Sequence, residues 1–385
     1  MIRNIIEITK HSINTESLKI NTSDDSEKIS CINETFRKRY QELNKIWDTS
    51  ALLQEKVGPI RWFLHDFNSY RFKITSELTD KPVQITNAFM KMYEFLLYMT
   101  PVLTKYDSIT HYDIASAPGM FIISAHEYFK KRNIKYSWNA SSRENIDAGD
   151  LCDTFDLFKN NPQNYSAVDV CSEEDIKKEI EKYPNRFDIV TGDIGIVFDK
   201  DYTKNILLEY QVLDQQWGQA RLALDLCKQG GCIYLKMFTY TCKQTHYLVD
   251  MLSEYFDKLY IVKPRTSKLM SEESYIIGVG RNSKDSIRMD FIRPKVIEYT
   301  SGNIKCFNEF EEQRYISRRD VIEFVKYMLE NDKFNKDYFR TTEVYKKYFK
   351  ENEVLINLFT LKLKNDKLLK RYMYKGGCKK RKFQK

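Results

Sequence analysis

Two lysines and two carboxylates stand in settings where a sheet would bring them together. They are Lys91 in NAFMKMYEF, Asp193 in FDIVTGDIGI, Lys236 in GGCIYLKMF and Glu273 in SEESYIIG. Lys236 ends a strongly apolar segment, and a buried ammonium there needs a partner or a function. Asp193 ends the preceding predicted strand, so both side chains should emerge at the carboxyl edge of a parallel sheet. Such a group of side chains is suited to abstracting a proton.

A neutral lysine amine is a suitable general base for a hydroxyl proton. Burial or a second cation lowers the pKa of a lysine only where it outweighs nearby carboxylates, and Lys91 would supply that cation for Lys236. Glu273 would hold the lysine by hydrogen bonding and balance its charge. Methyl transfer from a sulfonium to a sugar hydroxyl is an in-line reaction that gains from such proton removal and from positioning. For each residue alone, a surface salt bridge is the competing interpretation.

A turn rich in small residues, DIASAPGMF, should end a strand and open a helix. At such a turn an α/β sheet presents backbone N–H groups to a ligand, and small side chains let a nucleoside approach the main chain. The segment lacks the GKS/T ending of a P-loop, which argues against a nucleoside triphosphate. A tight turn needs small residues in any fold, so the pattern alone is only suggestive. The candidate cofactor-binding residues here are Asp113, Ala115, Ser116, Ala117, Pro118, Gly119 and Phe121.

Asp169 closes the third predicted strand, in YSAVDVCSEED. A carboxylate at that edge would accept a hydrogen bond from an adenine amino group. The competing interpretation is an N-cap or an N-terminal charge for the helix predicted in SEEDIKKEI.

The elements that must position these residues are predicted from about His111 to Arg281, where short apolar runs alternate with amphipathic ones. Helices are expected at 121–131, 207–228 and 244–256. This alternation predicts an α/β fold with a mostly parallel sheet covered by helices on both faces. The last two strands are joined without an obvious helix, which predicts an antiparallel final hairpin. The seven predicted strands are HYDIAS, IKYSWNAS, YSAVDV, RFDIVTGD, GGCIYLKMF, KLYIVKP and SYIIGVG.

The motifs FMKMYEF, DIASAPGMF, TGDIGI, GGCIYLKMF and KPRTSKLMSEESYIIG resemble those of the FtsJ/RrmJ-type RNA ribose 2′-O-methyltransferases, which include cap methyltransferases of large DNA viruses. The resemblance covers about Ile85 to Arg281. It implies a seven-stranded Rossmann-like class I methyltransferase fold, S-adenosylmethionine as methyl donor and RNA as acceptor. It also implies that Lys91, Asp193, Lys236 and Glu273 form a catalytic tetrad, that Asp169 contacts adenine and Asp193 also lies by the cofactor, and that the KPRTSK loop meets RNA phosphates.

Two departures from the family concern cofactor binding. Family members commonly carry glycine where Ala115 and Met120 stand. The second predicted strand lacks the usual terminal acid for the cofactor ribose, for which Asn139, Ser141 or Glu144 are the available substitutes. These departures keep open a methyltransferase-shaped RNA-binding or scaffold subunit with impaired cofactor binding.

The flanks of the predicted domain are helical. Apolar residues recur every three or four positions over 25–53, and similar spacing returns near 321–328 and 354–361. We therefore predict an N-terminal helical extension at 1–80, an FtsJ-like domain at 81–282 and a basic helical extension with a basic tail at 283–385. Helical extensions of this kind are expected to dock on a protein partner.

The bulk composition is that of a globular protein, with 42% hydrophobic and 30% charged residues among 385. A net charge of +8, concentrated partly after Asp366, favours a polyanionic partner, although a solvated tail explains the tail's share equally well. The eight cysteines form no CxxC pair, so no metal site is predicted and reduced thiols in a cytoplasm-like compartment are expected. No membrane-spanning or signal segment is predicted.

The favoured hypothesis is therefore a methyltransferase acting on a ribose 2′-hydroxyl of RNA, at or near the cap of messenger RNA. Ribosomal or transfer RNA and the non-catalytic scaffold are the alternatives. The expected compartment is the cytoplasm, or, for a viral protein, the virion or a cytoplasmic factory.

Overall fold

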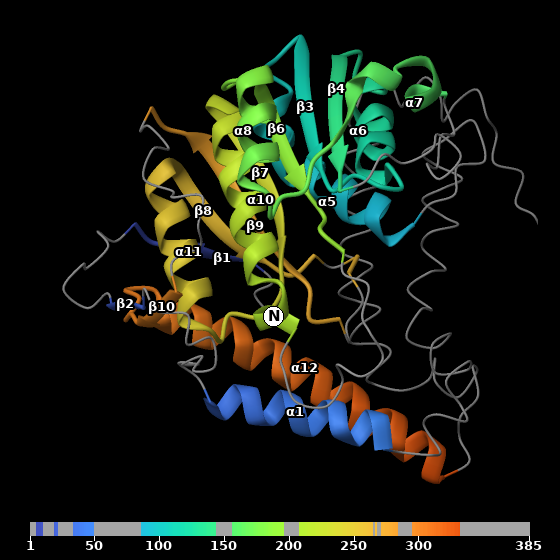
Figure 1. Cartoon of the computed structure of the whole chain (residues 1–385). Helices are drawn as coiled ribbons and strands as arrows, with labels where there is room; N and C mark the ends of the chain where they lie inside the picture. Colours follow the sequence, from blue (N-terminus) through green and yellow to red (C-terminus); the bar gives the residue numbers. More distant parts are fainter. Residues whose placement is uncertain are drawn as a thin grey trace, which may run out of the picture.

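The computed structural model describes residues 5–10, 19–21, 34–49, 86–143, 156–195, 208–264, 266–267, 271–283 and 295–331. Its centre is an eight-stranded sheet with the strand order β1-β8-β9-β7-β6-β3-β4-β5 (Figure 1). The strands are β1 (Ile5–Ile8), β3 (Ser108–Ile114), β4 (Lys135–Ser142), β5 (Tyr165–Ala167), β6 (Phe187–Gly192), β7 (Cys227–Met237), β8 (Phe256–Val262) and β9 (Ser274–Arg281).

Five strands pair in parallel in the order β7, β6, β3, β4 and β5 across the sheet. Strand β9 is antiparallel to both of its neighbours, β7 and β8. The predicted antiparallel final hairpin is therefore confirmed. Parallel strands end at one edge of the sheet, and the turns that follow β3 and β6 meet there.

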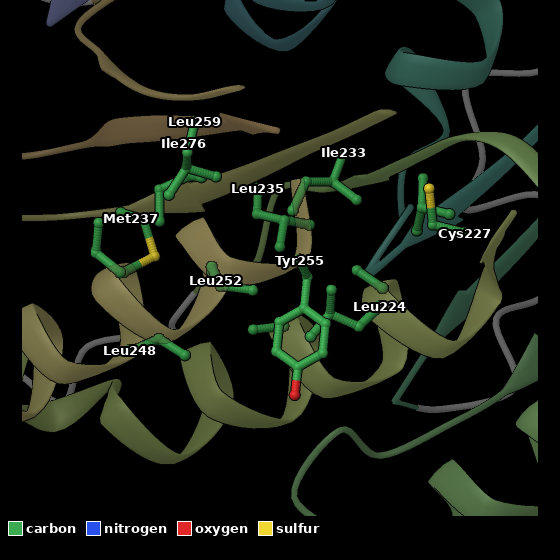
Figure 2. Close-up of a cluster of buried hydrophobic side chains, with 14 of the residues drawn as sticks. Leu224, Cys227, Ile233, Leu235, Met237, Leu248, Leu252, Tyr255, Leu259 and Ile276 are labelled. Atoms are coloured by element: carbon green, nitrogen blue, oxygen red, sulfur yellow. The ribbon is translucent and has the colours of Figure 1, made fainter. Parts of the chain in front are cut away.

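Helices cover both faces of the sheet. One face carries α5 (Asn87–Leu103), α6 (Met120–Lys130) and the short α7 (Leu157–Asn160), which is followed by a 3-10 turn (Pro162–Asn164). The other face carries α8 (Glu173–Lys182), α10 (Leu213–Leu226) and α11 (Lys243–Tyr255), with α9 (Leu208–Gln211) just before α10. Each layer buries its own apolar core, and Figure 2 shows part of the core that α10 and α11 form with β7.

Segments from both ends of the chain pack on this domain. β1 pairs antiparallel with β8 and adds an eighth strand that the sequence did not predict. A second sheet joins β2 (Lys19–Asn21) to β10 (Lys295–Glu298). α1 (Glu34–Thr49) lies along α12 (Ile304–Glu330), beneath the main sheet in Figure 1. The domain boundaries proposed at 80 and 282 stay predictions.

Several predicted element bounds were wrong. The helix predicted over 207–228 is two helices, and strand β7 already begins at Cys227, because its first residue pairs with Phe187 on β6. The third strand ends at Ala167, so Asp169 lies in the following turn. The helix predicted over 25–53 is described only as α1, and the spacing near 354–361 lies outside the described residues. Among the described helices, none has the length and apolar character needed to cross a membrane.

Candidate active site

Alternation along the strands brings the predicted residues to the α5 face of the sheet. On β7, Tyr234 packs toward α5 and Leu235 packs toward α10 and α11. Because side chains alternate along a strand, Lys236 shares the face of Tyr234. Tyr275 on β9 also packs toward α5, and Glu273 stands two residues before it. The end of β7 and the start of β9 lie side by side and therefore direct a lysine and a glutamate toward the same helix.

The other two residues reach this point from β6 and α5. Asp193 follows directly after β6, in the same alternation as Ile189, which packs toward α5 and α6. Lys91 lies early in α5, where the hydroxyl of Thr86 caps the helix by accepting a hydrogen bond from Phe89 N at 3.2 Å. The neighbours of Lys91 on α5 are buried, so the helix carries its ammonium group into the protein interior.

The four charged side chains form one closed cluster. Lys91 Nζ lies 3.3 Å from Asp193 Oδ2 and 3.2 Å from Glu273 Oε2. Lys236 Nζ lies 3.2 Å from Asp193 Oδ1 and 3.6 Å from the same Glu273 oxygen. Each lysine thus contacts both carboxylates. Only 5% of the Lys91 side chain is exposed and 12% of that of Lys236, so Lys236 is the more accessible lysine.

The charges of the cluster stabilise one another. Burial by itself would lower the pKa of Lys91, but the nearby carboxylates outweigh it and raise that pKa above its ordinary value. Burial by itself would raise the pKa values of Asp193 and Glu273, but the lysine charges outweigh it and lower both. Lys91 and the two carboxylates are therefore charged at neutral pH.

Three stacked aromatic rings lie against one side of the cluster. Tyr234 stacks between Phe95 and Tyr275, with ring centroids 4.4 Å apart on each side. The Tyr275 hydroxyl donates a 2.6 Å hydrogen bond to Asp193 Oδ1, and Lys91 Nζ lies 5.2 Å from the centre of the Tyr275 ring. The rings exclude water from one side of the charges and so strengthen their attraction.

A second buried lysine, Lys263, supports Glu273. It follows β8 and donates hydrogen bonds to the carbonyl oxygens of Glu273 at 2.7 Å and Ser271 at 2.8 Å, and to Ser267 Oγ at 3.0 Å. Ser267 in turn donates to the Glu273 carboxylate. Burial lowers the pKa of Lys263 well below its ordinary value.

Sequence reasoning missed the role of Lys263, because a lysine opening the basic KPRTSK segment was interpreted as an RNA contact. Its amine lies inside the protein, while Arg265 and Lys268 of that segment lie outside the described residues. Glu94, which follows Lys91 by one helical turn, was missed as well. Its carboxylate accepts hydrogen bonds from Thr266 N at 3.0 Å and Thr266 Oγ1 at 2.8 Å, and so fixes this segment to α5. A glutamate inside an apolar helix was the available signal.

The small-residue turn after β3 lies at the same edge of the sheet. Ser116 N donates to Ser141 O at 2.8 Å, and Ala117 N donates to Ser142 Oγ at 3.1 Å, which fixes the turn to the end of β4. Ala115 and Gly119 have positive φ values of 55° and 87°. A Cβ on Gly119 would lie 2.4 Å from the ring of Phe158, so only glycine fits.

Asp113 ends a buried chain of hydrogen bonds. Tyr136 Oη and His111 Nδ1 lie 2.7 Å apart, His111 Nε2 and Thr191 Oγ1 lie 2.7 Å apart, and the Thr191 hydroxyl donates to Asp113 Oδ1 at 2.6 Å. Burial lowers the pKa of His111 to about 3, so its neutral ring donates to Thr191 and accepts from Tyr136. Burial raises the pKa of Asp113 to about 7.

The remaining predicted residues lie around this turn. Phe121 is buried against Tyr234, with ring centroids 6.0 Å apart. Asp169 accepts a hydrogen bond from Cys171 N at 2.9 Å and pairs with Arg143, whose Nε lies 3.2 Å from Asp169 Oδ2. The N-cap of α8 is Ser172, so the alternative role of Asp169 as that cap is wrong.

Of the candidates for the missing ribose acid, Asn139 donates to the Tyr183 hydroxyl at 3.0 Å and Ser141 is buried. Glu144 lies outside the described residues.

The turn fits a nucleoside cofactor such as S-adenosylmethionine in two respects. No side chain among the described residues caps the N-terminus of α6, so its first N–H groups face the turn without a side-chain acceptor. Asp169 keeps 31% of its side chain exposed and shares its edge of the sheet with the turn, where a carboxylate would accept an amino group.

The strand order and the antiparallel β9 define a Rossmann-like methyltransferase fold, with a charged cluster beside its cofactor turn. Residues 85–281 match the family model described as FtsJ-like methyltransferase, and the chain belongs to this family.

Three relatives illustrate the range of similarity. A probable methyltransferase of African swine fever virus, EP424R, is 28% identical over 276 residues, which cover 66% of this chain and 61% of that protein. The cap-specific mRNA (nucleoside-2′-O-)-methyltransferase 2 of Drosophila melanogaster is 24% identical over 61% of this chain and 34% of its own length. The ribosomal RNA large subunit methyltransferase E of Methanococcus vannielii is 32% identical over 32% of this chain and 46% of that protein. The chain thus spans less than two thirds of the length of each of these three relatives.

Proposed function

We propose that this protein transfers a methyl group from S-adenosylmethionine to a ribose 2′-hydroxyl of RNA. The observation that supports this most is the closed cluster of Lys91, Asp193, Lys236 and Glu273 at the sheet edge that also carries the cofactor turn. Two lysines and two acids at the carboxyl edge suit the activation of a hydroxyl nucleophile. When bound, the cofactor supplies a methyl group on a sulfonium, which a nucleophile attacks in line.

Lys236 is the proposed general base. It is the more exposed of the two lysines in the cluster, so its amine is the one that a substrate hydroxyl reaches. In its neutral form the amine accepts the hydroxyl proton as the new C–O bond forms. Asp193 and Glu273 hold Nζ of Lys236 in place through contacts of 3.2 and 3.6 Å. Lys91 keeps both carboxylates paired and ionised.

The cofactor is assigned to the turn after β3. Ala115, Ser116, Ala117, Pro118 and Gly119 would line its path along the main chain, with Asp113 and Phe121 at the ends of the turn. Asp169 would accept the adenine amino group, and Asp193, a member of the tetrad, would also lie beside the cofactor. Because Asp113 is buried and accepts a hydrogen bond from Thr191, its role is to hold the turn in place rather than to contact the cofactor directly.

RNA is proposed as the acceptor, with the cap region of messenger RNA as the favoured site. The similarity to the Drosophila cap-specific enzyme over 61% of this chain supports this choice. The similarity to the archaeal ribosomal RNA enzyme covers a shorter segment, 32% of the chain, and makes ribosomal RNA the alternative acceptor. A polyanion also suits the net charge of +8. For a substrate of this kind, the cytoplasm is the proposed compartment.

The test is transfer of a radiolabelled methyl group from S-adenosylmethionine to capped RNA, uncapped RNA and ribosomal RNA, with mapping of the methylated position. Replacing Lys236 by Met should lower kcat on the preferred RNA by about 10² to 10⁴, the usual contribution of a general base. Lys228→Met is the matched control, because Lys228 lies at the other end of the same strand and pairs with Asp188. Full activity of Lys236→Met would refute the proposed base.

A methyltransferase-shaped RNA-binding subunit without transferase activity is the second candidate. The pairing of Arg143 with Asp169 favours it, because an arginine follows β4 where the family usually has an acid. Calorimetric titration with S-adenosylmethionine separates the two functions. Cofactor binding supports the enzyme, whereas RNA binding without cofactor binding supports the subunit.

A further inference from the structure

We propose that helix α12, which lies outside the family domain, is a positioning element for the tetrad, and that Arg314 is its central residue. The inference deepens the proposed function and rests on it. The family model ends at residue 281, whereas α12 spans Ile304–Glu330. Side chains of α12 nevertheless contact the two chain segments that carry Lys236 and Glu273.

Arg314 bridges these segments through two backbone carbonyl groups. Its Nη1 donates a 2.9 Å hydrogen bond to the carbonyl oxygen of Phe238, and its Nη2 donates to that of Glu272. Phe238 stands two residues after Lys236, and Glu272 immediately precedes Glu273. The Arg314 side chain is only 6% exposed, so both hydrogen bonds form away from solvent.

The two carbonyl groups lie where the ladder between β7 and β9 stops. The last paired residues are Met237 and Ser274. Phe238, whose carbonyl Arg314 binds, directly follows Met237, and Glu272 stands two residues before Ser274. Buried backbone oxygens need donors, and a planar guanidinium satisfies two acceptors at a fixed separation. Arg314 thus continues the connection between the two strands past the point where backbone hydrogen bonds hold them. The Ser274 hydroxyl strengthens this connection by donating to Phe238 O at 2.6 Å.

Two further side chains, one turn of α12 on either side of Arg314, make related contacts. Glu311 accepts a hydrogen bond from Tyr240 N at 3.0 Å and pairs with Arg314 Nη1 at 3.2 Å. Arg318 Nη1 pairs with Glu272 Oε1 at 3.2 Å, and both side chains are mostly buried. Spacings of three and four residues put Glu311, Arg314 and Arg318 on one face of the helix. That face of α12 therefore contacts the ends of both strands.

The geometry of catalysis depends on this connection. Lys236 and Glu273 each stand one residue from the last pair of the ladder, Met237 and Ser274, and their side chains approach to 3.6 Å. A misplacement of reacting groups by about 1 Å is enough to cost about 10²-fold in rate. Loss of the Arg314 bridge should therefore lower the rate of the chemical step while leaving the binding of RNA and cofactor in place.

The test compares Arg314→Met and Arg314→Lys in the full chain, with Arg221→Met as control. Arg221 is also a buried arginine in a helix, with its Nε 3.0 Å from Asp225, but α10 covers the opposite face of the sheet from the tetrad. Lysine keeps the charge of Arg314 without its two-pronged geometry, so it separates charge from positioning. Arg318→Met provides a milder loss of the same contacts in case Arg314→Met does not fold.

Two readouts are measured on each folded variant. Hydrogen–deuterium exchange should become faster in peptides covering 236–240 and 271–275 for both Arg314 variants and stay unchanged there for Arg221→Met. On capped RNA, kcat should fall by about tenfold or more with KM for RNA and cofactor nearly unchanged, as expected for misplaced reacting groups. Unchanged exchange in these peptides, or unchanged kcat in a folded Arg314→Met protein, would overturn the inference. A wild-type protein without transferase activity would refute the proposed function, and the exchange data alone would then decide whether α12 holds these segments.

Discussion

Replacing Lys91 by Met tests whether the four charges of the cluster stabilise the folded protein together. Lys91 Nζ lies within 3.4 Å of both carboxylates, and only 5% of its side chain is exposed. Its removal leaves Asp193 and Glu273 with the second lysine of the cluster as their shared partner. Removing one member of a buried ion pair typically costs about 3 to 5 kcal/mol, and we expect a loss of about 3 kcal/mol at pH 7 because Lys236 remains.

The pH dependence of this loss follows from the pKa shifts. In the wild type, the pKa values of Asp193 and Glu273 lie below their unfolded values, so their contribution is complete above about pH 4.5 and lost as pH falls through the folded values. The raised pKa of Lys91 gives a contribution that is present below its unfolded value of 10.5 and lost as pH rises through the folded value. The cluster should therefore stabilise the wild type equally between about pH 5 and pH 9.

In Lys91→Met, the positive charge of Lys91 no longer opposes the burial and the mutual repulsion of Asp193 and Glu273. The pKa values of these two carboxyl groups therefore rise. Protonation of one carboxylate then relieves part of the strain in the folded state as pH falls. The destabilisation relative to wild type should consequently be smaller at pH 5 than at pH 7, and nearly equal at pH 7 and pH 9. Other buried groups titrate in both proteins and cancel in the difference.

The measurement is urea unfolding at pH 5, 7 and 9, followed by circular dichroism, with the free energy of unfolding obtained by linear extrapolation. Lys258→Met on β8 is the control for simple loss of a lysine, because its side chain is exposed. The reasoning is refuted by a loss below about 0.5 kcal/mol at pH 7, which is the range of an exposed ion pair. A loss that grows toward pH 5 would refute the pH argument.

Two further predictions concern the turn after β3. Gly119→Ala should destabilise the protein more than Gly230→Ala. Both glycines have positive φ, so both substitutions strain the backbone. A Cβ on Gly119 would also lie 2.4 Å from the Phe158 ring, whereas none of the described atoms lies within 4 Å of a Cβ on Gly230. Thermal unfolding measures the difference, and equal losses would contradict the steric argument. Asp113→Asn should flatten the pH dependence of stability. The raised pKa of Asp113, about 7 against 3.8 when unfolded, gives stability that is complete below pH 3.8 and lost as pH rises through 7. Wild-type stability should therefore fall relative to the variant by up to about 1.4 kcal/mol per pH unit between pH 5 and 7, and parallel curves would contradict this.

The sequence predicted those parts of the fold and site that depend on local pattern. Alternating apolar runs predicted the seven strands of the domain, and the final hairpin is confirmed because β8 and β9 pair antiparallel. The tetrad residues come together because each stands at the end of a strand or on an apolar helix, where topology fixes the neighbours. A lysine after GGCIYL needs only its own strand to place it at the sheet edge.

Contacts between distant segments could not be predicted in this way. β1 is four residues long and pairs with β8 across some 250 residues of chain, and no local pattern distinguishes it from a flanking segment. Arg314 lies 42 residues after the carbonyl group of Glu272 that it binds, in a helix whose sequence indicated only amphipathic spacing. For Lys263 the resemblance implies an RNA contact, because a charged residue in a basic segment gives no sign that its partners are backbone carbonyls.

These missed residues share one physical cause. Regular backbone hydrogen bonding ends at the strand ends that carry the tetrad, and the buried N–H and C=O groups just beyond them need other partners. Glu209 accepts hydrogen bonds from Thr241 N and Cys242 N after β7, as Arg314 and Lys263 donate to carbonyl groups after β7 and before β9. A family motif records the four groups proposed to do the chemistry, whereas these supporting charges depend on which helices each chain packs beside the site. Substitution of a supporting charge should therefore alter catalysis in this protein without altering any residue of the motif.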